Sequence, residues 1–106
     1  MGGITTERYE YIKWYVNEDN FPLLFYEVDT KNDRYATRMT EVYPNGKIIN
    51  VTENSEFVTE APVPTVNLIN ADKDFYAEHI TKDEFEEIYN SSFYTGDISF
   101  PKQVIS

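Results

Sequence analysis

Carboxylates dominate the side chains of this sequence that could carry chemistry. Glu27 and Asp29 lie two residues apart, so on an extended strand they share one face, as the paired carboxylates of glycosidases and metal sites can. Arg34 and Arg38 follow on the next predicted strand, where guanidinium groups can pair with these carboxylates across a sheet. Cross-strand ion pairing therefore accounts for this group of residues without any reaction.

The remaining catalytic and metal-binding patterns are incomplete. His79 is the only histidine, the chain has no cysteine, and nothing near His79 resembles an activated serine. Asp72, Asp74 and Glu78 are spaced loosely like calcium ligands, but the glycine and the full ligand series of an EF-hand loop are missing. None of the four glycines begins a phosphate-binding glycine motif. We therefore predict a protein that is not an enzyme, without catalytic residues, metal or cofactor.

The charge of the chain limits its partners. Nineteen acidic and nine basic residues give a net charge of −10, and residues 51–106 carry eleven of the acids but three of the bases. Nucleic acids and anionic membranes are therefore poor partners, whereas a basic protein would be attracted. The acidic residues predicted to contact such a partner are Glu53, Glu56, Glu60, Asp72, Asp74, Glu78, Glu86 and Glu87. Solubility alone also explains an excess of acid, and this simpler explanation stays open.

A second hypothesis is a small-ligand site. Trp14 and Tyr26 could stack on the base of a nucleotide, and Arg34 or Arg38 could contact its phosphates. The protein would then sequester a nucleotide or a similar anionic molecule. The alternative for Trp14 is a place in the hydrophobic core.

Hydrophobic alternation and turn residues predict the strands. Asn45-Gly46 is typical of a tight hairpin because both residues tolerate the positive φ that such turns require. Apolar residues that alternate, or run together between turn residues, predict five strands, over residues 9–16, 23–29, 34–43, 48–51 and 75–80. The first four form an antiparallel meander joined by short loops.

One helix has a clear start signal. Thr81 and Glu84 match a capping box, and Ile80 and Phe85 occupy the two positions of a hydrophobic staple. The apolar spacing that follows predicts a helix that ends near Ser91. Residues 64–70 could form one short helical turn, after a surface loop.

The expected fold class is α+β: a four- or five-stranded, mainly antiparallel sheet with one C-terminal helix packed on a face. Residues 1–106 are predicted to form a single domain, with a flexible lead-in over residues 1–7. The tail over residues 93–106 is apolar, so it packs on its own sheet or joins another copy in a homo-oligomer. The lack of cysteine and of a secretion signal favours the cytoplasm.

Several short segments also resemble a known family. Those that carry the resemblance include Tyr26-Glu27-Val28-Asp29, Arg38-Met39-Thr40-Glu41-Val42-Tyr43, Ala61-Pro62-Val63-Pro64 and Ile80-Thr81-Lys82-Asp83-Glu84-Phe85. They resemble a family of small uncharacterised bacterial proteins over most of residues 9–90. The resemblance implies no established activity. In general character the chain is similar to the immunity partners of bacterial toxins, and this analogy favours a protein that inhibits a toxin or a defence effector.

Overall fold

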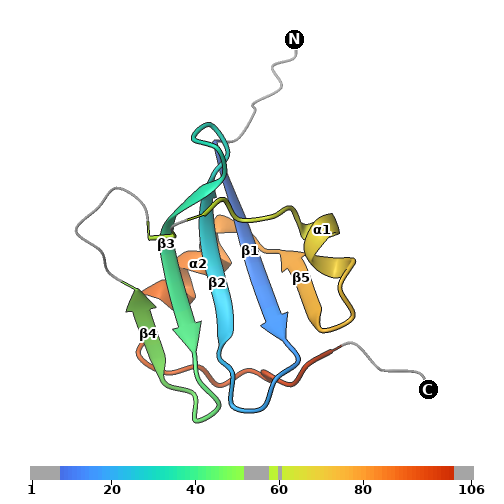
Figure 1. Ribbon diagram of the computed structural model, residues 1–106. Coiled ribbons are helices and arrows are strands. Elements are labelled where there is room, and N and C mark those ends of the chain that lie inside the picture. The colour runs from blue at the N-terminus through green and yellow to red at the C-terminus, as the bar shows by residue number, and fades with distance from the viewer. Residues whose placement is uncertain (1–7, 52–57, 60, 102–106) are drawn as a thin grey trace.

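The protein is a five-stranded antiparallel sheet with two short helices, which confirms the expected α+β class (Figure 1). The computed structural model describes residues 8–51, 58–59 and 61–101. The strand order is β4-β3-β2-β1-β5, and every neighbouring pair is antiparallel. The elements are β1 (Tyr9–Val16), β2 (Leu23–Asp29), β3 (Tyr35–Val42), β4 (Ile48–Val51), α1 (Val66–Asn70), β5 (Phe75–His79) and α2 (Lys82–Tyr89).

Apolar side chains on both faces of β1 and β2 explain why the sheet is covered on both sides. On β1, Ile12 belongs to one hydrophobic cluster, whereas Tyr11 and Tyr15 belong to the other. β2 is the central strand, and all of its residues are buried. We call the face of Ile12 and Tyr26 the front face, and the face of Tyr11 and Phe25 the back face.

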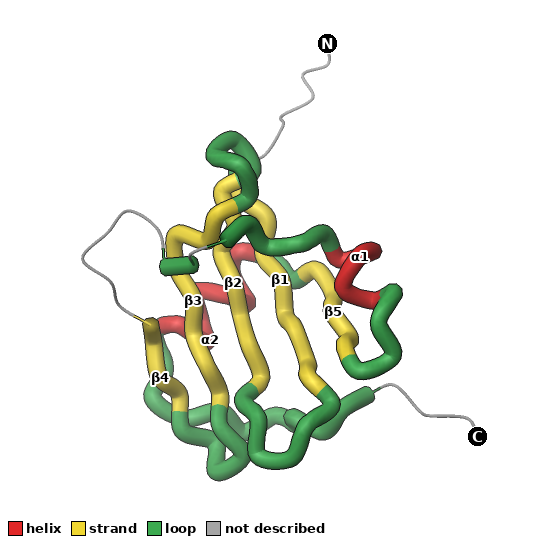
Figure 2. The backbone as a smooth tube through the Cα atoms, viewed as in Figure 1, coloured by secondary structure: helices red, strands yellow, loops and turns green. Residues whose placement is uncertain are grey.

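The front face is covered by residues 61–70, which lead to and form α1. This segment crosses in front of the strands before it reaches α1 (Figure 2). Val63 and Ile69 are its buried residues, and both join the front cluster. The short helix is capped by Thr65, whose side chain accepts a hydrogen bond from the amide of Leu68. The turn considered possible over residues 64–70 is therefore a second helix.

The back face is covered by α2 and by the segment after it. Thr81 and Glu84 form the predicted capping box, and Phe85 is fully buried beneath the helix. Tyr94, Ile98 and Phe100 pack on the same cluster. The described part of the apolar tail thus lies on its own sheet.

Both outer strands of the sheet are partly shielded. On β5, the side-chain amide of Asn70 bonds both the N–H and the C=O of Ala77, so it occupies the place of a neighbouring strand. On β4, the amide of Ile48 donates to the carbonyl of Ser92. Such blocking discourages edge-to-edge association. None of the helices in the described part of the chain is long and apolar enough to cross a membrane.

The third strand is shorter than predicted. Arg34 was expected to begin it, but β3 starts at Tyr35 and ends at Val42. Arg34 has a φ of 63° and Asp33 a φ of 55°, so both lie in the left-handed region and close a turn. The side chain of Arg34 is therefore not placed by the alternation of a strand.

We predict that α2 is held by its buried ring more than by its cap. Phe85→Ala should lower the free energy of unfolding by about 3 kcal/mol because it empties a fully buried site. Thr81→Ala should cost about 1 kcal/mol through loss of the cap. Leu68→Ala, at a side chain that is 67% exposed, is the matched control. Denaturant unfolding measures all three, and a Phe85→Ala protein as stable as the parent would contradict this packing.

Candidate functional site

Arg38 is enclosed by two carboxylates and two aromatic rings on the back face. Its guanidinium donates to Glu27 on β2, with an Nη2–Oε2 distance of 2.7 Å, and to Glu86 on α2, at 2.6 Å. It also lies over the rings of Phe85 and Tyr89, 5.0 and 4.9 Å from their centroids. The hydrogen bonds hold the pKa of Arg38 above its usual range. Arg38 thereby ties β2, β3 and α2 together.

Glu27 is a buried carboxylate that accepts hydrogen bonds from several neighbouring side chains. The register between β2 and β3 shifts at this point, so Thr37 and Arg38 both lie opposite Glu27. The hydroxyls of Thr37 and Tyr11 donate to it at 2.7 and 2.8 Å. Burial alone would raise the pKa of Glu27, but the hydrogen bonds from Arg38, Thr37 and Tyr11 outweigh it and lower the pKa to about 2. Glu27 is therefore a stable anion at neutral pH.

The other two arginines, Arg8 and Arg34, also form ion pairs with carboxylates. Arg8 donates to Asp29 at 3.0 Å, and this contact is the first cause of an Asp29 pKa lowered to about 2. Arg34 binds both oxygens of Glu10, at 2.8 and 3.2 Å, and also donates to the carbonyl of Val63. The hydrogen bonds from Arg34 lower the pKa of Glu10.

The predicted cross-strand set is thus half correct. Glu27 pairs with Arg38 as expected. Asp29 pairs with Arg8, and Arg34 with Glu10. The reason is the left-handed turn at Arg34, which takes that residue out of the strand. All three arginines of the sequence are consequently bound to carboxylates of the same chain.

The residues predicted to form a nucleotide site do not all lie on the same face of the sheet. Trp14 and Tyr26 lie on the front face, with ring centroids 5.9 Å apart, and Trp14 packs against the front cluster. Arg34 holds the crossing segment on that face, whereas Arg38 lies on the back face with Glu27 and Phe85. Arg38 and Trp14 therefore cannot contact one small ligand together.

His79 borders a cleft of about 460 Å³ between the start of β1 and the start of α2. Its Nε2 lies 3.4 Å from Glu10, which is also bound to Arg34, and its side chain is 60% exposed. Thr81, beside it, is occupied by the capping box. The described residues contain no group of three or more His, Asp or Glu side chains that could hold a metal ion.

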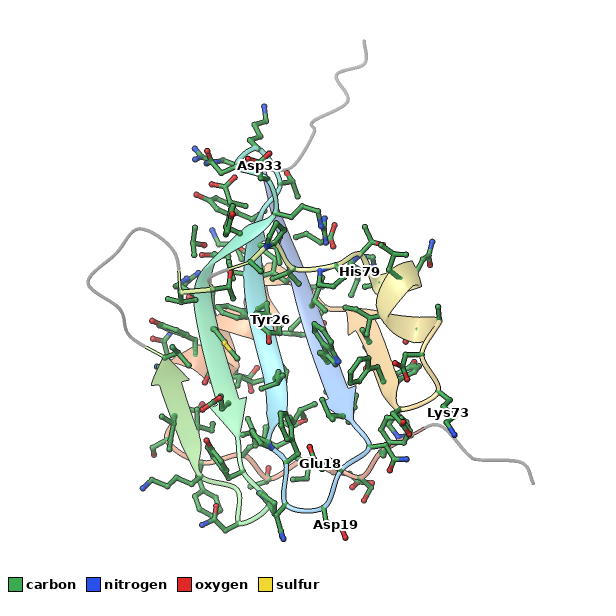
Figure 3. All side chains as sticks on the ribbon, viewed as in Figure 1. Glu18, Asp19, Tyr26, Asp33, Lys73 and His79 are labelled. Atoms are coloured by element: carbon green, nitrogen blue, oxygen red, sulfur yellow. The ribbon has the colours of Figure 1, made fainter. Side chains whose placement is uncertain are left out.

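Exposed acids gather at one end of the sheet. The turn between β1 and β2 exposes Glu18 and Asp19, which Figure 3 shows at this end, as it does Lys73. The amide of Asn17 donates to the carbonyl of Asp74 at 2.8 Å, so the turn after α1 lies beside the first turn. We call the turns over residues 17–22 and 71–74 the acidic end.

A hollow of about 390 Å³ opens at the acidic end. Its apolar lining comes from three separate parts of the chain, and Glu18 and Asp19 also line it. We call it the end hollow. The apolar residues are Val16, Phe21, Pro44, Ile98 and Phe100.

The acidic residues predicted from the sequence are scattered. Asp72 and Asp74 belong to the acidic end, and Glu87 is exposed on α2. Glu86 is bound to Arg38, and Glu78 on β5 lies 4.0 Å from Lys13. Three further residues lie outside the described part of the chain: Glu53, Glu56 and Glu60.

Sequence reasoning missed the other half of the acidic end. Glu18 and Asp19 are not among the acidic residues predicted from the sequence to contact a partner. Phe21, which is 39% exposed, received no role. The available signal was an acidic turn followed by an aromatic residue, together with an apolar tail that needed a surface to pack on.

The chain belongs to the family described as Domain of unknown function (DUF6881), whose model matches residues 8–94. The matched range contains all five strands and both helices. Comparisons with curated proteins and with solved structures give no match. Ile98 and Phe100, which line the end hollow, lie beyond the matched range.

We predict that the buried carboxylates make the fold acid-sensitive. A carboxylate whose pKa is lowered on folding stabilises the protein above its unfolded pKa, and this stabilisation is lost as the pH falls towards the folded value. The pKa of Glu27 is 4.5 in the unfolded chain and about 2 in the folded one. Protonation of Glu27 should therefore lower the free energy of unfolding at pH 3 by about 2 kcal/mol relative to pH 7. Asp29 adds to the loss in the same direction, from 3.8 to about 2.

Denaturant unfolding between pH 7 and pH 3 measures this loss. Glu27→Gln should be less stable at pH 7 and should show a flatter dependence on pH, because its side chain does not titrate. Asp33→Asn, at an exposed turn residue, is the control and should follow the parent. Parallel curves for Glu27→Gln and the parent would show that Glu27 is not the titrating group.

Proposed function

We propose that this is a non-enzymatic acidic binding protein that inhibits or neutralises a protein partner by covering a basic surface. Partners of the immunity or anti-defence kind, a bacterial toxin or a defence effector, fit this proposal. Its place of action would be the cytoplasm. The observation that supports it most is the pairing of all three arginines with carboxylates of the same chain.

The arginine pairs decide which charges face outwards. Arg34 and Arg38 have side chains that are 23% and 27% exposed, and both are bound to carboxylates. The exposed acids of the described residues, such as Glu18, Asp19 and Glu87, are therefore offset at the surface by lysines and not by these two arginines. The field of the net negative charge speeds the approach of a basic protein and repels phosphate backbones.

The alternative, a protein that sequesters a nucleotide, fits these contacts less well. A nucleotide phosphate would have to replace Glu10 on Arg34, or Glu27 and Glu86 on Arg38. Either exchange would leave a partly or fully buried carboxylate without its cation, which is costly. A basic protein partner requires no such exchange, because it binds acids that are already exposed.

The first experiment identifies the partner and measures how charge controls its binding. The tagged protein is used to capture partners from a strain that carries its gene, and association rates are then measured at several salt concentrations. Glu18→Lys/Asp19→Lys is compared with Asp83→Lys/Glu87→Lys on α2. Each reversal adds two charges, so both variants change the net charge from −10 to −6.

We expect a basic partner whose association with the acidic-end variant is at least about tenfold slower and less dependent on salt. The α2 variant should slow association less, because the proposed contact is at the acidic end and Asp83 and Glu87 lie on α2; in this proposal Glu87, expected from the sequence to touch the partner, does not do so. A partner that is acidic, or that binds both variants as fast as the parent, would refute the proposal. Calorimetry against nucleotides is the complementary test, and tight stoichiometric binding of one of them would favour the alternative.

A further inference from the structure

The end hollow has an apolar base built on the hydrophobic core. Ile98 and Phe100 line it and also pack on the back cluster, whereas Val16 lines it and packs on the front cluster. Phe21 is 39% exposed here, which is high for a large aromatic side chain. The volume of about 390 Å³ lies within the range of roughly 300–1,000 Å³ that is usual for binding sites.

The shape of the hollow is held by backbone hydrogen bonds. The amide of Phe21 donates to the carbonyl of Glu18, and the amide of Asn17 donates to that of Asp74. In the third lining segment, the amide of Ser99 donates to the side-chain carboxylate of Asp97 at 2.8 Å. A hollow with walls fixed in this way does not have to be assembled when a ligand binds, which lowers the cost of binding.

Charge selects the kind of side chain that can enter. Glu18 and Asp19 are exposed at the hollow and form no ion pair with any residue in the described part of the chain. A purely apolar ligand would partly desolvate these carboxylates without replacing their water, and an anionic one would be repelled. A cationic group next to the apolar one removes both costs.

We propose that the end hollow receives an apolar side chain of the partner that is flanked in sequence by lysine or arginine. This inference rests on the proposed function and specifies its contact. The apolar side chain enters between Phe21 and Phe100, and the flanking cations meet Glu18 and Asp19. A buried apolar anchor with charged contacts at its rim is the usual arrangement at the centre of a protein interface.

A second copy of this chain is a poor occupant. Two molecules that each carry −10 repel one another, and the two acids at the hollow would face further acids. A run of lysines without an apolar residue would be attracted by the field but would leave the lining of Phe21, Ile98 and Phe100 uncovered. A ligand of the end hollow therefore needs both an apolar side chain and a neighbouring cationic one.

Three synthetic peptides of equal length test this requirement by fluorescence anisotropy. The first has one phenylalanine between two pairs of lysines, the second has serine in place of the phenylalanine, and the third has glutamates in place of the lysines. We expect the parent protein to bind the first at least about tenfold more tightly than the second, and not to bind the third. Phe21→Ser should abolish the difference between the first two, whereas Leu68→Ser, another exposed apolar residue, should preserve it.

The outcomes separate this inference from the proposed function. Equal binding of the phenylalanine and serine peptides, or no binding of either, would overturn the inference even where the partner still binds with a charge-dependent rate. If the Phe21→Ser protein still prefers the phenylalanine peptide to the serine peptide tenfold, the apolar contact lies elsewhere and the inference is also overturned. Glu18→Gln/Asp19→Asn, which keeps the size of both side chains, should weaken binding of the first peptide. Unfolding midpoints of all variants confirm that each is folded.

Discussion

The contact on which most of the fold depends is the ion pair between Glu27 and Arg38 under α2. Glu27 lies at the middle of the sheet, on the central strand, with 7% of its surface exposed. A carboxylate in such a place requires a cation and further donors, because an unpaired buried charge costs several kcal/mol. Arg38, Thr37 and Tyr11 provide them. Arg38 then reaches Glu86, so the same guanidinium positions the helix that covers the back face.

This arrangement links the interior of the protein to its surface. The arginines are placed where internal carboxylates need them, at Asp29, Glu10 and Glu27. Glu18 and Asp19 form no ion pair with any residue in the described part of the chain, and their turn lies beside the turn after α1. The exposed excess of acid follows from how the charges are distributed in the fold, as well as from the composition of the chain. The same distribution leaves a hollow with an apolar base that is also lined by two acids, Glu18 and Asp19, without an ion pair in the described part of the chain.

The sequence was a good guide wherever the determining interactions are local. Strand alternation predicted β1 and β2 with the bounds that the structure has, and the capping box of Thr81 and Glu84 predicted the start of α2. It could not show that β5 pairs with β1, because that contact joins residues that are far apart in the sequence, such as Trp14 and Ala77. Pairing of charges had the same limit. Glu27 and Arg38 are neighbours across one hairpin, as are Arg8 and Asp29, whereas Arg38 and Glu86 meet only when α2 packs on the sheet.

The end hollow shows the limit most clearly. Its lining joins Phe21, Pro44 and Phe100, which no local pattern connects. The acidic residues chosen from the sequence came from its most acidic stretch, and one of them, Glu86, is part of the internal network. The acidic composition predicted that the surface charge is negative, but not where acidic side chains and apolar surface lie next to one another.

The central claim is that each of the three arginines is bound to a carboxylate of the same chain, and that Arg34 and Arg38 do not leave theirs to bind a ligand. Nitrogen-edited NMR of the arginine side chains, during a titration with adenosine triphosphate, tests this directly. The claim predicts that the Nε–Hε signals of Arg34 and Arg38, whose side chains are 23% and 27% exposed, exchange slowly with solvent, and that all three arginine signals keep their positions throughout the titration. A saturable shift of the Arg34 or Arg38 signal would contradict it, because it would show a guanidinium that leaves its carboxylate to bind phosphate.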